Sequence, residues 1–483
     1  MRLIIILFLA VCSINTLAQQ PPKPYGALPT QRQLAWHDIE TYGLIHFTPT
    51  TFENKEWGYG DADPKTFNPT NFDAEQIVKA AKAGGLKGII LVAKHHDGFA
   101  LWPTKTTAYN ISKSPFKNGK GDLVKEIEQA ARKNGLKFGV YCSPWDRNNA
   151  NYGTADYLKI YQAQLKELYS NYGELFMSWH DGANGGDGYY GGAKEKRSID
   201  NTTYYDWNNT WQITRNMQPM ANIFSDVGLD VRWVGNEYGF AADTSWATFT
   251  PMPPKGVNVA VPGQANYPES PMGIRDGKFW MPAECDVPLR KGWFYHANEK
   301  PKSVSSLIDL YFKSVGRGAA LDLGLAPDTR GLLHEDDVVN LKQFGDILSK
   351  TFSTDFAKDA KITASQTRGK TYGVSLLTDN NKKTYWATAD EINKAELIVD
   401  FGKQINFDVI SLQEYIPLGQ RIDGFTVEVF ENNNWKLINA GASIGAKRLI
   451  RLEKPVTSNK IRIKVKAPVA ITLSEIGVYQ LAI

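Results

Sequence analysis

Between about residue 30 and residue 350 the sequence alternates short apolar segments with amphipathic ones, and this alternation restricts the fold more than any other feature. Three of the apolar segments have the length of a β-strand: 43–47, 88–93 and 137–141. Three of the amphipathic segments have the apolar spacing of a helix: 74–83, 123–133 and 157–172. The segment 88–93 is continuously apolar, as expected of a strand covered on both faces of a parallel sheet. The repeated strand–helix unit predicts a TIM-like (β/α)8 barrel and leaves open whether all eight units are regular.

The second half of this region is less regular. Residues 241–278 are rich in Pro and Gly, which predicts long loops of the kind that shape a substrate site at a barrel mouth. The remaining elements that we expect are strands over 175–179, 222–226 and 319–325, and helices over 303–315 and 334–350.

After Thr351 the pattern changes to short segments that alternate polar and apolar residues and are separated by turn residues. This period of two, without helical spacing, predicts a separate β-sandwich. We therefore expect a leader over 1–18, a catalytic barrel over 19–352 and an all-β domain over 353–483.

The N-terminus has one positive charge, Arg2, then a short apolar run and small residues up to Ala18. This is the pattern of a secretory signal peptide and not of a membrane span, so we expect an exported protein, periplasmic or secreted. A lipoprotein attached through Cys12 is the less favoured alternative, because Val11 stands where a small residue is usual. Only Cys142 and Cys285 would remain after cleavage, and we expect both to be buried free thiols.

The charge balance does not favour nucleic acid as a partner. The chain carries 55 Lys and Arg against 51 Asp and Glu, a formal net charge of +4, so electrostatics gives no argument for nucleic acid binding. Aromatic residues make up 12% of the chain. Some of them can stack on the apolar faces of sugars, although core packing accounts for most.

Two acidic residues follow predicted strands. Asp181 comes after the apolar run 175–179 and opens a glycine-rich loop, and Glu237 follows a short apolar and aromatic segment between Gly235 and Gly239. Barrel enzymes present catalytic carboxylates at the C-terminal ends of their strands. Glycoside hydrolysis needs two such groups, one that attacks or activates water and one that protonates the leaving oxygen. Their distance in space decides between retention and inversion, and the sequence does not contain it.

Four of the seven histidines stand where predicted strands end: His46, His95, His96 and His180. The adjacent pair could be read as metal ligands, but neighbouring residues on a strand point to opposite faces, so we do not expect them to share an ion. As hydrogen-bonding groups for sugar hydroxyls they need no metal.

A set of motifs in matching order resembles the α-L-fucosidases of glycoside hydrolase family 29, over roughly residues 30–350. The motifs are His46-Phe47, Glu56-Trp57, Lys94-His95-His96-Asp97-Gly98-Phe99, Ser143-Pro144-Trp145-Asp146-Arg147, Trp179-His180-Asp181-Gly182-Ala183-Asn184 and Arg232-Trp233-Val234-Gly235-Asn236-Glu237. The last two are similar to the forms in the subgroup that prefers α-1,3- and α-1,4-linked fucose on branched, Lewis-type glycans.

The resemblance implies a role for each matching residue. Asp181 corresponds to the nucleophile and Glu237 to the acid/base. Binding of the fucose hydroxyls is implied for His46, Glu56, His95, His96 and Tyr141, while Trp293 would pack against the apolar face and methyl group. His180 departs from the family pattern, and we expect it to tune Asp181 or to contact a hydroxyl. The resemblance gives Arg232 no role.

The C-terminal domain resembles the discoidin-type (F5/8C) carbohydrate-binding fold through residues 377–386 and 474–479. That resemblance implies a structural calcium ion between an early Asp and a late Glu, here Asp379 and Glu475, whose oxygens suit a hard cation. Sugar binding by this domain and a purely structural role remain equal alternatives.

We therefore predict an exo-acting, retaining α-L-fucosidase that acts on fucosylated oligosaccharides or glycoconjugates and needs no cofactor for catalysis. Two alternatives remain: a barrel hydrolase for another sugar, and a catalytically inactive glycan-binding protein.

Overall fold

The computed structural model describes residues 20–483 except 226–228, 254–255, 257, 259 and 263–267. The predicted signal peptide and the last residue of the predicted strand 222–226 lie outside the described residues.

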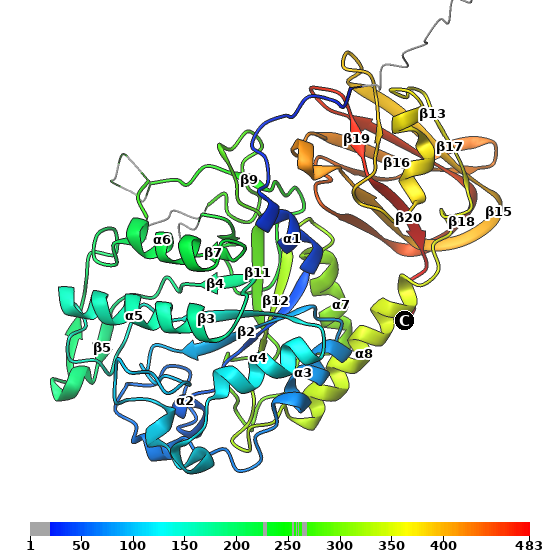
Figure 1. Cartoon of the computed structure of the whole chain (residues 1–483). Coiled ribbons are helices and arrows are strands. Elements are labelled where there is room, and N and C mark those ends of the chain that lie inside the picture. Colours follow the sequence, from blue (N-terminus) through cyan, green and yellow to red (C-terminus); the bar gives the residue numbers. More distant parts are fainter. Residues whose placement is uncertain (1–19, 226–228, 254–255, 257, 259, 263–267) are drawn as a thin grey trace, which may run out of the picture.

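The first domain is a barrel of parallel strands with helices outside it (Figure 1). Its strands are β1 (Thr41–Ile45), β2 (Gly88–Lys94), β3 (Lys137–Cys142), β4 (Met177–Trp179), β7 (Asn222–Phe224), β8 (Arg232–Trp233), β11 (Ala283–Pro288) and β12 (Ala320–Leu325). They are hydrogen-bonded in the order β7-β4-β3-β2-β1-β12-β11-β8. A parallel bridge between Phe224 and Val231 joins the two ends, so the sheet is nearly closed. The predicted barrel is confirmed.

The helices around the barrel are α1 (Gln31–Ile39), α3 (Ala74–Ala83), α4 (Leu123–Lys133), α5 (Ala155–Asn171), α6 (Trp207–Met217), α7 (Val304–Lys313) and α8 (Glu335–Thr351). Helices α3 and α4 have the predicted bounds, because Asp73 and Asp122 accept hydrogen bonds from backbone N–H groups of their first turns. In the described parts of the segments that follow β7 and β8 there is no helix before the next barrel strand. The barrel is therefore irregular at these two units.

Strand β2 shows how the barrel core is built. Ile89 and Leu91 pack outward against the helices, in the cluster that contains Ile77 and Ile127, whereas Ile90 and Val92 pack inside the barrel with Tyr141 and Trp179. Alternate side chains of a strand point to opposite faces. Both faces of β2 are buried, which explains its continuous apolar sequence.

The long segment between β8 and β11 includes the short pair β9 (Thr248–Phe249) and β10 (Phe279–Trp280). Arg232 of β8 attaches this segment to the barrel. Its buried guanidinium donates to the carbonyl oxygens of Ser270 (3.0 Å) and Trp246 (2.9 Å), and also to that of Met281. Burial lowers the pKa of Arg232 to about 9. This gives Arg232 a structural role that the sequence did not reveal.

The second domain is antiparallel. Its larger sheet has the order β13 (Lys361–Ala364), β15 (Lys394–Gln413), β18 (Arg448–Lys466), β16 (Gly424–Glu431) and β17 (Asn434–Gly441), with β20 (Glu475–Tyr479) also paired to β15. A second, two-stranded sheet contains β14 (Trp386–Ala387) and β19 (Thr472–Leu473). The two sheets share one apolar core, to which Trp386 and Leu473 contribute from the smaller sheet. The predicted all-β domain is confirmed, and helix α8 ends ten residues before β13 begins.

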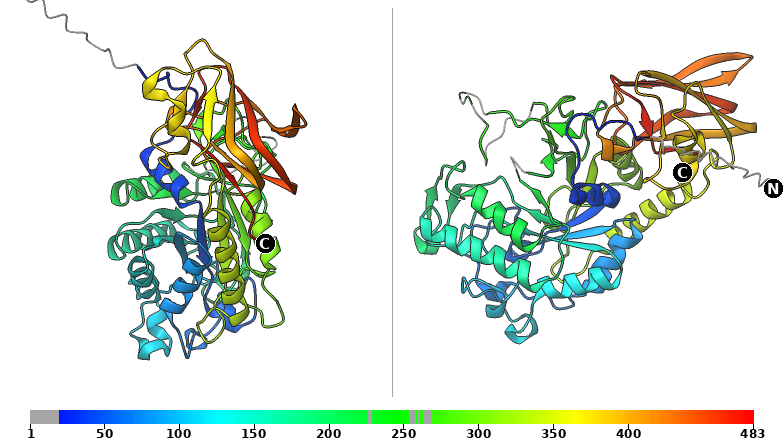
Figure 2. Two further views of the ribbon diagram at one scale, coloured as in Figure 1. Left: turned by 90° about the vertical axis from the view of Figure 1, so that its right-hand side faces the viewer. Right: turned by 45° about the horizontal axis from the view of Figure 1, so that its top comes forward.

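The second domain lies beside the barrel (Figures 1 and 2) and contacts residues that precede barrel strands. Lys447 pairs with Glu40, just before β1, and Leu449 N–H donates to the carbonyl of Gly316, before β12 (2.9 Å). These contacts lie at the amino ends of the strands. The C-terminal domain is therefore attached at the opposite end of the barrel from the carboxyl ends of its strands.

Both remaining cysteines, Cys142 and Cys285, are buried and unpaired, as predicted. Among the described helices, none is long and apolar enough to cross a membrane.

Candidate active site

The predicted site residues come from the carboxyl ends of different barrel strands. They lie in or after β1 (His46), β2 (His95, His96), β3 (Tyr141), β4 (Asp181), β8 (Glu237) and β11 (Trp293). Since all these strands are parallel, their carboxyl ends lie at one end of the barrel, where enzymes of this fold build their sites.

The carboxylate of Asp181 is held by two hydrogen bonds. The hydroxyl of Tyr141 donates to Oδ2 (2.7 Å), and the N–H of Ala183 donates to Oδ1 (2.7 Å). The side chain is 23% exposed, and His96 Nε2 lies 3.8 Å from Oδ2. Asp181 is thus fixed in orientation and still open to a ligand.

The neighbours of His96 determine which of its nitrogens carries the proton. Ser143 Oγ donates to the carbonyl oxygen of Trp145 (2.8 Å), so it accepts from His96 Nδ1 (2.8 Å). Burial lowers the pKa of His96, and the charge of Asp181 only partly opposes this. At neutral pH the ring is therefore neutral, and its Nε2 lone pair is available to accept a hydrogen bond.

His46 and His95 are buried beside each other, with ring centroids 5.5 Å apart, and the Nδ1 atoms of both have no hydrogen-bond partner. Burial lowers the pKa of His46 to about 3 and that of His95 well below its ordinary value. A buried polar atom without a partner is costly, and a bound ligand with several hydroxyls would supply one.

The premise that His95 and His96 point to opposite faces is wrong. The rings of His95 and His96 lie on the same side of the chain, with centroids 4.1 Å apart. Strand β2 ends at Lys94, so both histidines lie in the turn that follows, where strand alternation no longer applies. Lys94 itself points out of the barrel, and its Nζ contacts Asp146, Tyr157 and Gln164 at 2.9–3.3 Å.

Glu56 fixes the loop that carries Trp293. Its carboxylate accepts from the backbone N–H of Trp293 (2.8 Å) and of Phe294 (3.3 Å), and from His296 Nε2 (2.7 Å). The Trp293 ring lies 5.2 Å from the His46 ring and packs on β12 at Gly324, where an added Cβ would be only 2.7 Å away. A glycine at position 324 thus makes room for the indole at the edge of the site.

Glu237 belongs to the same site. Partial burial raises the pKa of its carboxyl, a hydrogen bond from the Trp293 side chain opposes this rise, and the charges of Asp181 and Glu56 add to it. The two acids predicted from separate strands are therefore close enough to influence each other. A carboxyl with a raised pKa, close to a second carboxylate, is the arrangement of an acid/base pair.

His180 is not part of the cluster. Its ring is fully buried on the outer side of β4, where Nδ1 interacts with the hydroxyl of Tyr161 (2.7 Å) and Nε2 with Ser178 Oγ (3.1 Å). The expectation that His180 contacts the sugar does not fit this position. Alternation along residues 179–181 explains it, because Trp179 and Asp181 face inward and the residue between them faces the helices.

The structure adds two features to which the sequence analysis gave no role. Trp57 is 52% exposed and its ring packs edge-on against His96 (5.2 Å) and Trp145 (5.5 Å). Inside the barrel, β11 and β12 bury three carboxyl groups, those of Glu284, Asp286 and Asp322. Acids alternate with small apolar residues in 283–288, a pattern that could have indicated a strand there, but none was predicted.

In the C-terminal domain, Asp379 and Glu475 lie close together. Burial and the charge of Asp379 raise the pKa of Glu475 to about 7, and Glu475 Oε1 is buried without a partner. Thr384 Oγ1 and the N–H of Asn381 donate to the Asp379 carboxylate (2.7 and 2.9 Å). Two adjacent carboxyls with an unused oxygen fit a hard cation.

Comparison with known proteins agrees with this site. The sequence model described as Alpha-L-fucosidase matches residues 27–351, and the F5/8 type C domain matches residues 361–476. "Alpha-L-fucosidase 1" of Arabidopsis thaliana is 37% identical over 477 residues, which cover 97% of this chain and 90% of that protein.

Solved structures are similar over nearly the whole chain. A fucosidase of glycoside hydrolase family 29 from Ruminococcus gnavus in complex with fucose has a TM-score of 0.84 at 31% identity, and the match covers 96% of this chain and 97% of that one. A member of the same family from an unknown rumen bacterium has a TM-score of 0.83 at 37% identity, with 95% and 78% covered. The chain therefore belongs to the α-L-fucosidases of glycoside hydrolase family 29 and is a glycoside hydrolase with a C-terminal F5/8 type C domain.

Proposed function

We propose that this enzyme is an exo-acting, retaining α-L-fucosidase in which Asp181 is the nucleophile and Glu237 the acid/base. The observation that carries the proposal is the pairing of these two groups: one carboxylate is oriented by Tyr141 and Ala183, and one carboxyl in the same site has a raised pKa. A retaining mechanism needs this division between an ionised and a protonated acid.

In the first step Asp181 attacks the anomeric carbon while the glycosidic C–O bond breaks, and the proton of Glu237 goes to the leaving oxygen. The products are the free aglycone and a fucosyl ester of Asp181. In the second step the ionised Glu237 takes a proton from water, whose oxygen attacks the anomeric carbon and releases Asp181. Fucose leaves with its original anomeric configuration.

Most of the groups that would bind the sugar are uncharged, which suits a neutral substrate. His46, His95 and the Nε2 of His96 are available to its hydroxyls, and Tyr141 and Glu56 complete the polar wall. The Trp293 ring offers an apolar surface for the sugar face and its methyl group. His180 has no part in this assignment.

We further propose that the substrates are α-1,3- and α-1,4-linked fucosides of Lewis-type or branched glycans, and that residues 1–18 direct export to the periplasm or the medium. The support for the linkage is the similarity of residues 181–184 and 233–237 to that subgroup, and the support for export is the leader-like sequence.

Replacement of the proposed nucleophile should separate chemistry from binding. Asp181→Gly should lower kcat on an aryl fucoside by about 10³-fold or more, because no carboxylate remains to form the ester. Sodium azide should restore part of the rate and yield β-fucosyl azide, identified by NMR. Azide should not accelerate the wild type, and full activity of the variant would exclude Asp181 from this role.

The raised pKa of Glu237 predicts how activity falls at high pH. Glu237 must be protonated in the first step, so kcat/KM decreases as the pH rises through its pKa. Trp293→Phe removes the hydrogen bond that favours the ionised form, and the pKa of Glu237 should rise further. The alkaline limb of the kcat/KM profile should therefore move to higher pH.

Trp57→Phe is the matched control, since Trp57 contacts His96 and is not among the groups that shift the pKa of Glu237, so its alkaline limb should stay in place. An unchanged alkaline limb in Trp293→Phe would contradict the assignment of Glu237 as the acid.

The linkage proposal is tested by comparing the release of fucose from a Lewis trisaccharide and from 2′-fucosyllactose. We expect kcat/KM to be at least about tenfold higher for the trisaccharide, a difference that one or two contacts to the aglycone can produce. Equal rates, or a preference for the α-1,2 linkage, would refute the linkage part while leaving the catalytic assignment intact.

We also propose that Asp379 and Glu475 hold a structural calcium ion, which would bridge the loop at residues 379–384 to β20 and play no part in catalysis. Calcium should raise the Tm of the wild type, and EDTA should remove the effect. Asp379→Asn and Glu475→Gln should abolish the calcium-dependent part of Tm, whereas the exposed Glu391→Gln should keep it. A Tm that does not respond to calcium would refute the proposal.

A further inference from the structure

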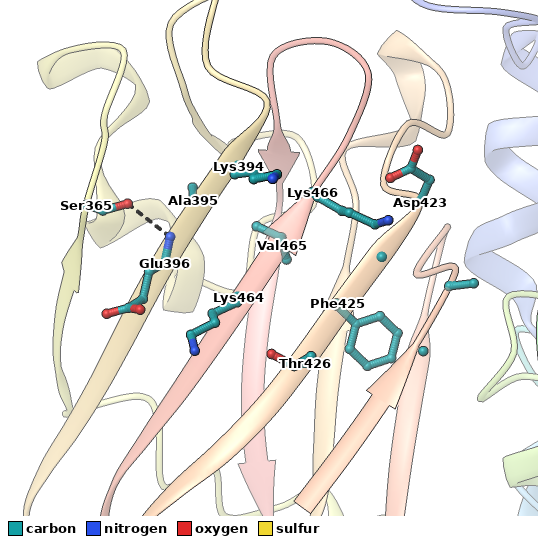
Figure 3. A pocket seen from close by; sticks show the side chains of 13 residues that line it. Ser365, Lys394, Ala395, Glu396, Asp423, Phe425, Thr426, Lys464, Val465 and Lys466 are labelled. Atoms are coloured by element: carbon teal, nitrogen blue, oxygen red, sulfur yellow. Dashed lines mark hydrogen bonds between the residues drawn. The ribbon is translucent and has the colours of Figure 1, made fainter. Parts of the chain in front are cut away.

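The outer face of the larger sheet in the C-terminal domain carries a groove of about 700 Å³ (Figure 3). It crosses strands β15, β18 and β16, and its outward-facing lining includes Lys394, Glu396, Thr426, Lys464 and Lys466. The residues between them, Ala395, Val465 and Phe425, belong to the core beneath. The size of this groove is within the range of small-molecule sites.

Two lysines at one end of this groove have side chains without a partner. Lys394 and Lys466 are directly opposite in the register of β15 and β18, and among the described residues the ammonium group of neither has a hydrogen bond or an ion pair. Like charges directly opposite each other destabilise an antiparallel sheet. Figure 3 shows the two side chains on neighbouring strands at the same end of the groove.

The other charged groups of the groove are already engaged. Lys464 pairs with Glu428 (3.2 Å), Asp423 with Arg275 (2.9 Å), and Glu396 with Arg462 (3.7 Å). The unbalanced charge is therefore positive and localised at Lys394 and Lys466.

The surface beside Lys466 is lined by small residues. Gly424 is opposite Lys466 in the register, and an added Cβ there would be 2.3 Å from the lysine side chain. The Lys466 methylene groups thus lie over the glycine, and Gly441 and Ala442 continue the small-residue lining. An apolar floor beside cationic groups suits a ligand that combines a sugar ring with an anion.

We propose that this groove binds an acidic saccharide, with the ammonium groups of Lys394 and Lys466 on either side of a sulfate ester or carboxylate. A saccharide is the natural source of the anion because the enzyme is a glycoside hydrolase and meets glycans as its substrates. The groove lies on the domain attached at the amino ends of the barrel strands, so binding there is separate from cleavage and would hold the enzyme on anionic glycans.

The test is calorimetric titration of the full-length protein with 3′-sulfated lactose, lactose and sodium sulfate. We expect 3′-sulfated lactose to bind more tightly than either of the other two, and its binding to weaken as the salt concentration rises. The double variant Lys394→Gln/Lys466→Gln should weaken binding at least about tenfold, a loss of roughly 1.4 kcal/mol.

The matched control is Lys460→Gln, six residues before Lys466 on β18, where the lysine is paired with Asp400. It changes the net charge but should leave the affinity unchanged.

All variants should hydrolyse an aryl fucoside at the wild-type rate, so failure of this inference can be told from failure of the catalytic assignment. Removal of one member of the opposed pair, as in Lys466→Gln, should not lower Tm.

Three outcomes would overturn the inference: no binding of the sulfated sugar, binding that the double variant retains, or equal affinity for inorganic sulfate and 3′-sulfated lactose.

Discussion

Burial has the largest effect on the pKa values of the groups around this site. It lowers the pKa values of His46, His95 and His96, so the three imidazoles are neutral at the pH where they would meet a sugar. It raises the pKa of Glu237, which keeps a proton available for a leaving oxygen. A neutral, hydroxyl-rich ligand matches such a site better than an ion would, because no charge has to be transferred from water into the barrel.

The barrel provides this burial through local features of its strands. Strand β2 ends at Lys94, whose side chain is held outside the barrel by Asp146, and the turn that follows brings two adjacent histidines inside. On the other side of the barrel, Arg232 attaches the long segment after β8 to the strand that leads to Glu237. Lys94 and Arg232 are thus both buried cations. They fix the backbone around the site and do not face the ligand.

The sequence was sufficient to predict the barrel, the all-β domain and the strands that carry Asp181 and Glu237, because strongly apolar runs and capped helices are local signals. It was not sufficient for the direction of individual side chains. The pair His95 and His96 was expected to diverge and instead converges, since the end of β2 depends on hydrogen bonds with neighbouring strands. His180 departs from the family pattern, and its expected contact with a hydroxyl did not take into account that strand alternation turns it toward the helices.

Burial also raises the pKa values of the carboxyl groups that β11 and β12 place inside the barrel. Glu284 accepts from Trp179 Nε1 (2.7 Å) and from the Tyr42 hydroxyl, and burial raises its pKa to about 7. Asp286 accepts from Trp233 Nε1 (2.8 Å), and its pKa, like that of Asp322, lies well above the ordinary value.

Ionisation of all three would place three negative charges close together in the barrel interior, at a cost that burial makes large. Burial therefore favours the protonated form of all three carboxyls. Trp179 connects these buried carboxyls to the site. It donates to Glu284 and stacks on Tyr141 (4.9 Å), which in turn donates to Asp181. The position of the proposed nucleophile is thus fixed by the packing of the barrel interior as well as by its own loop.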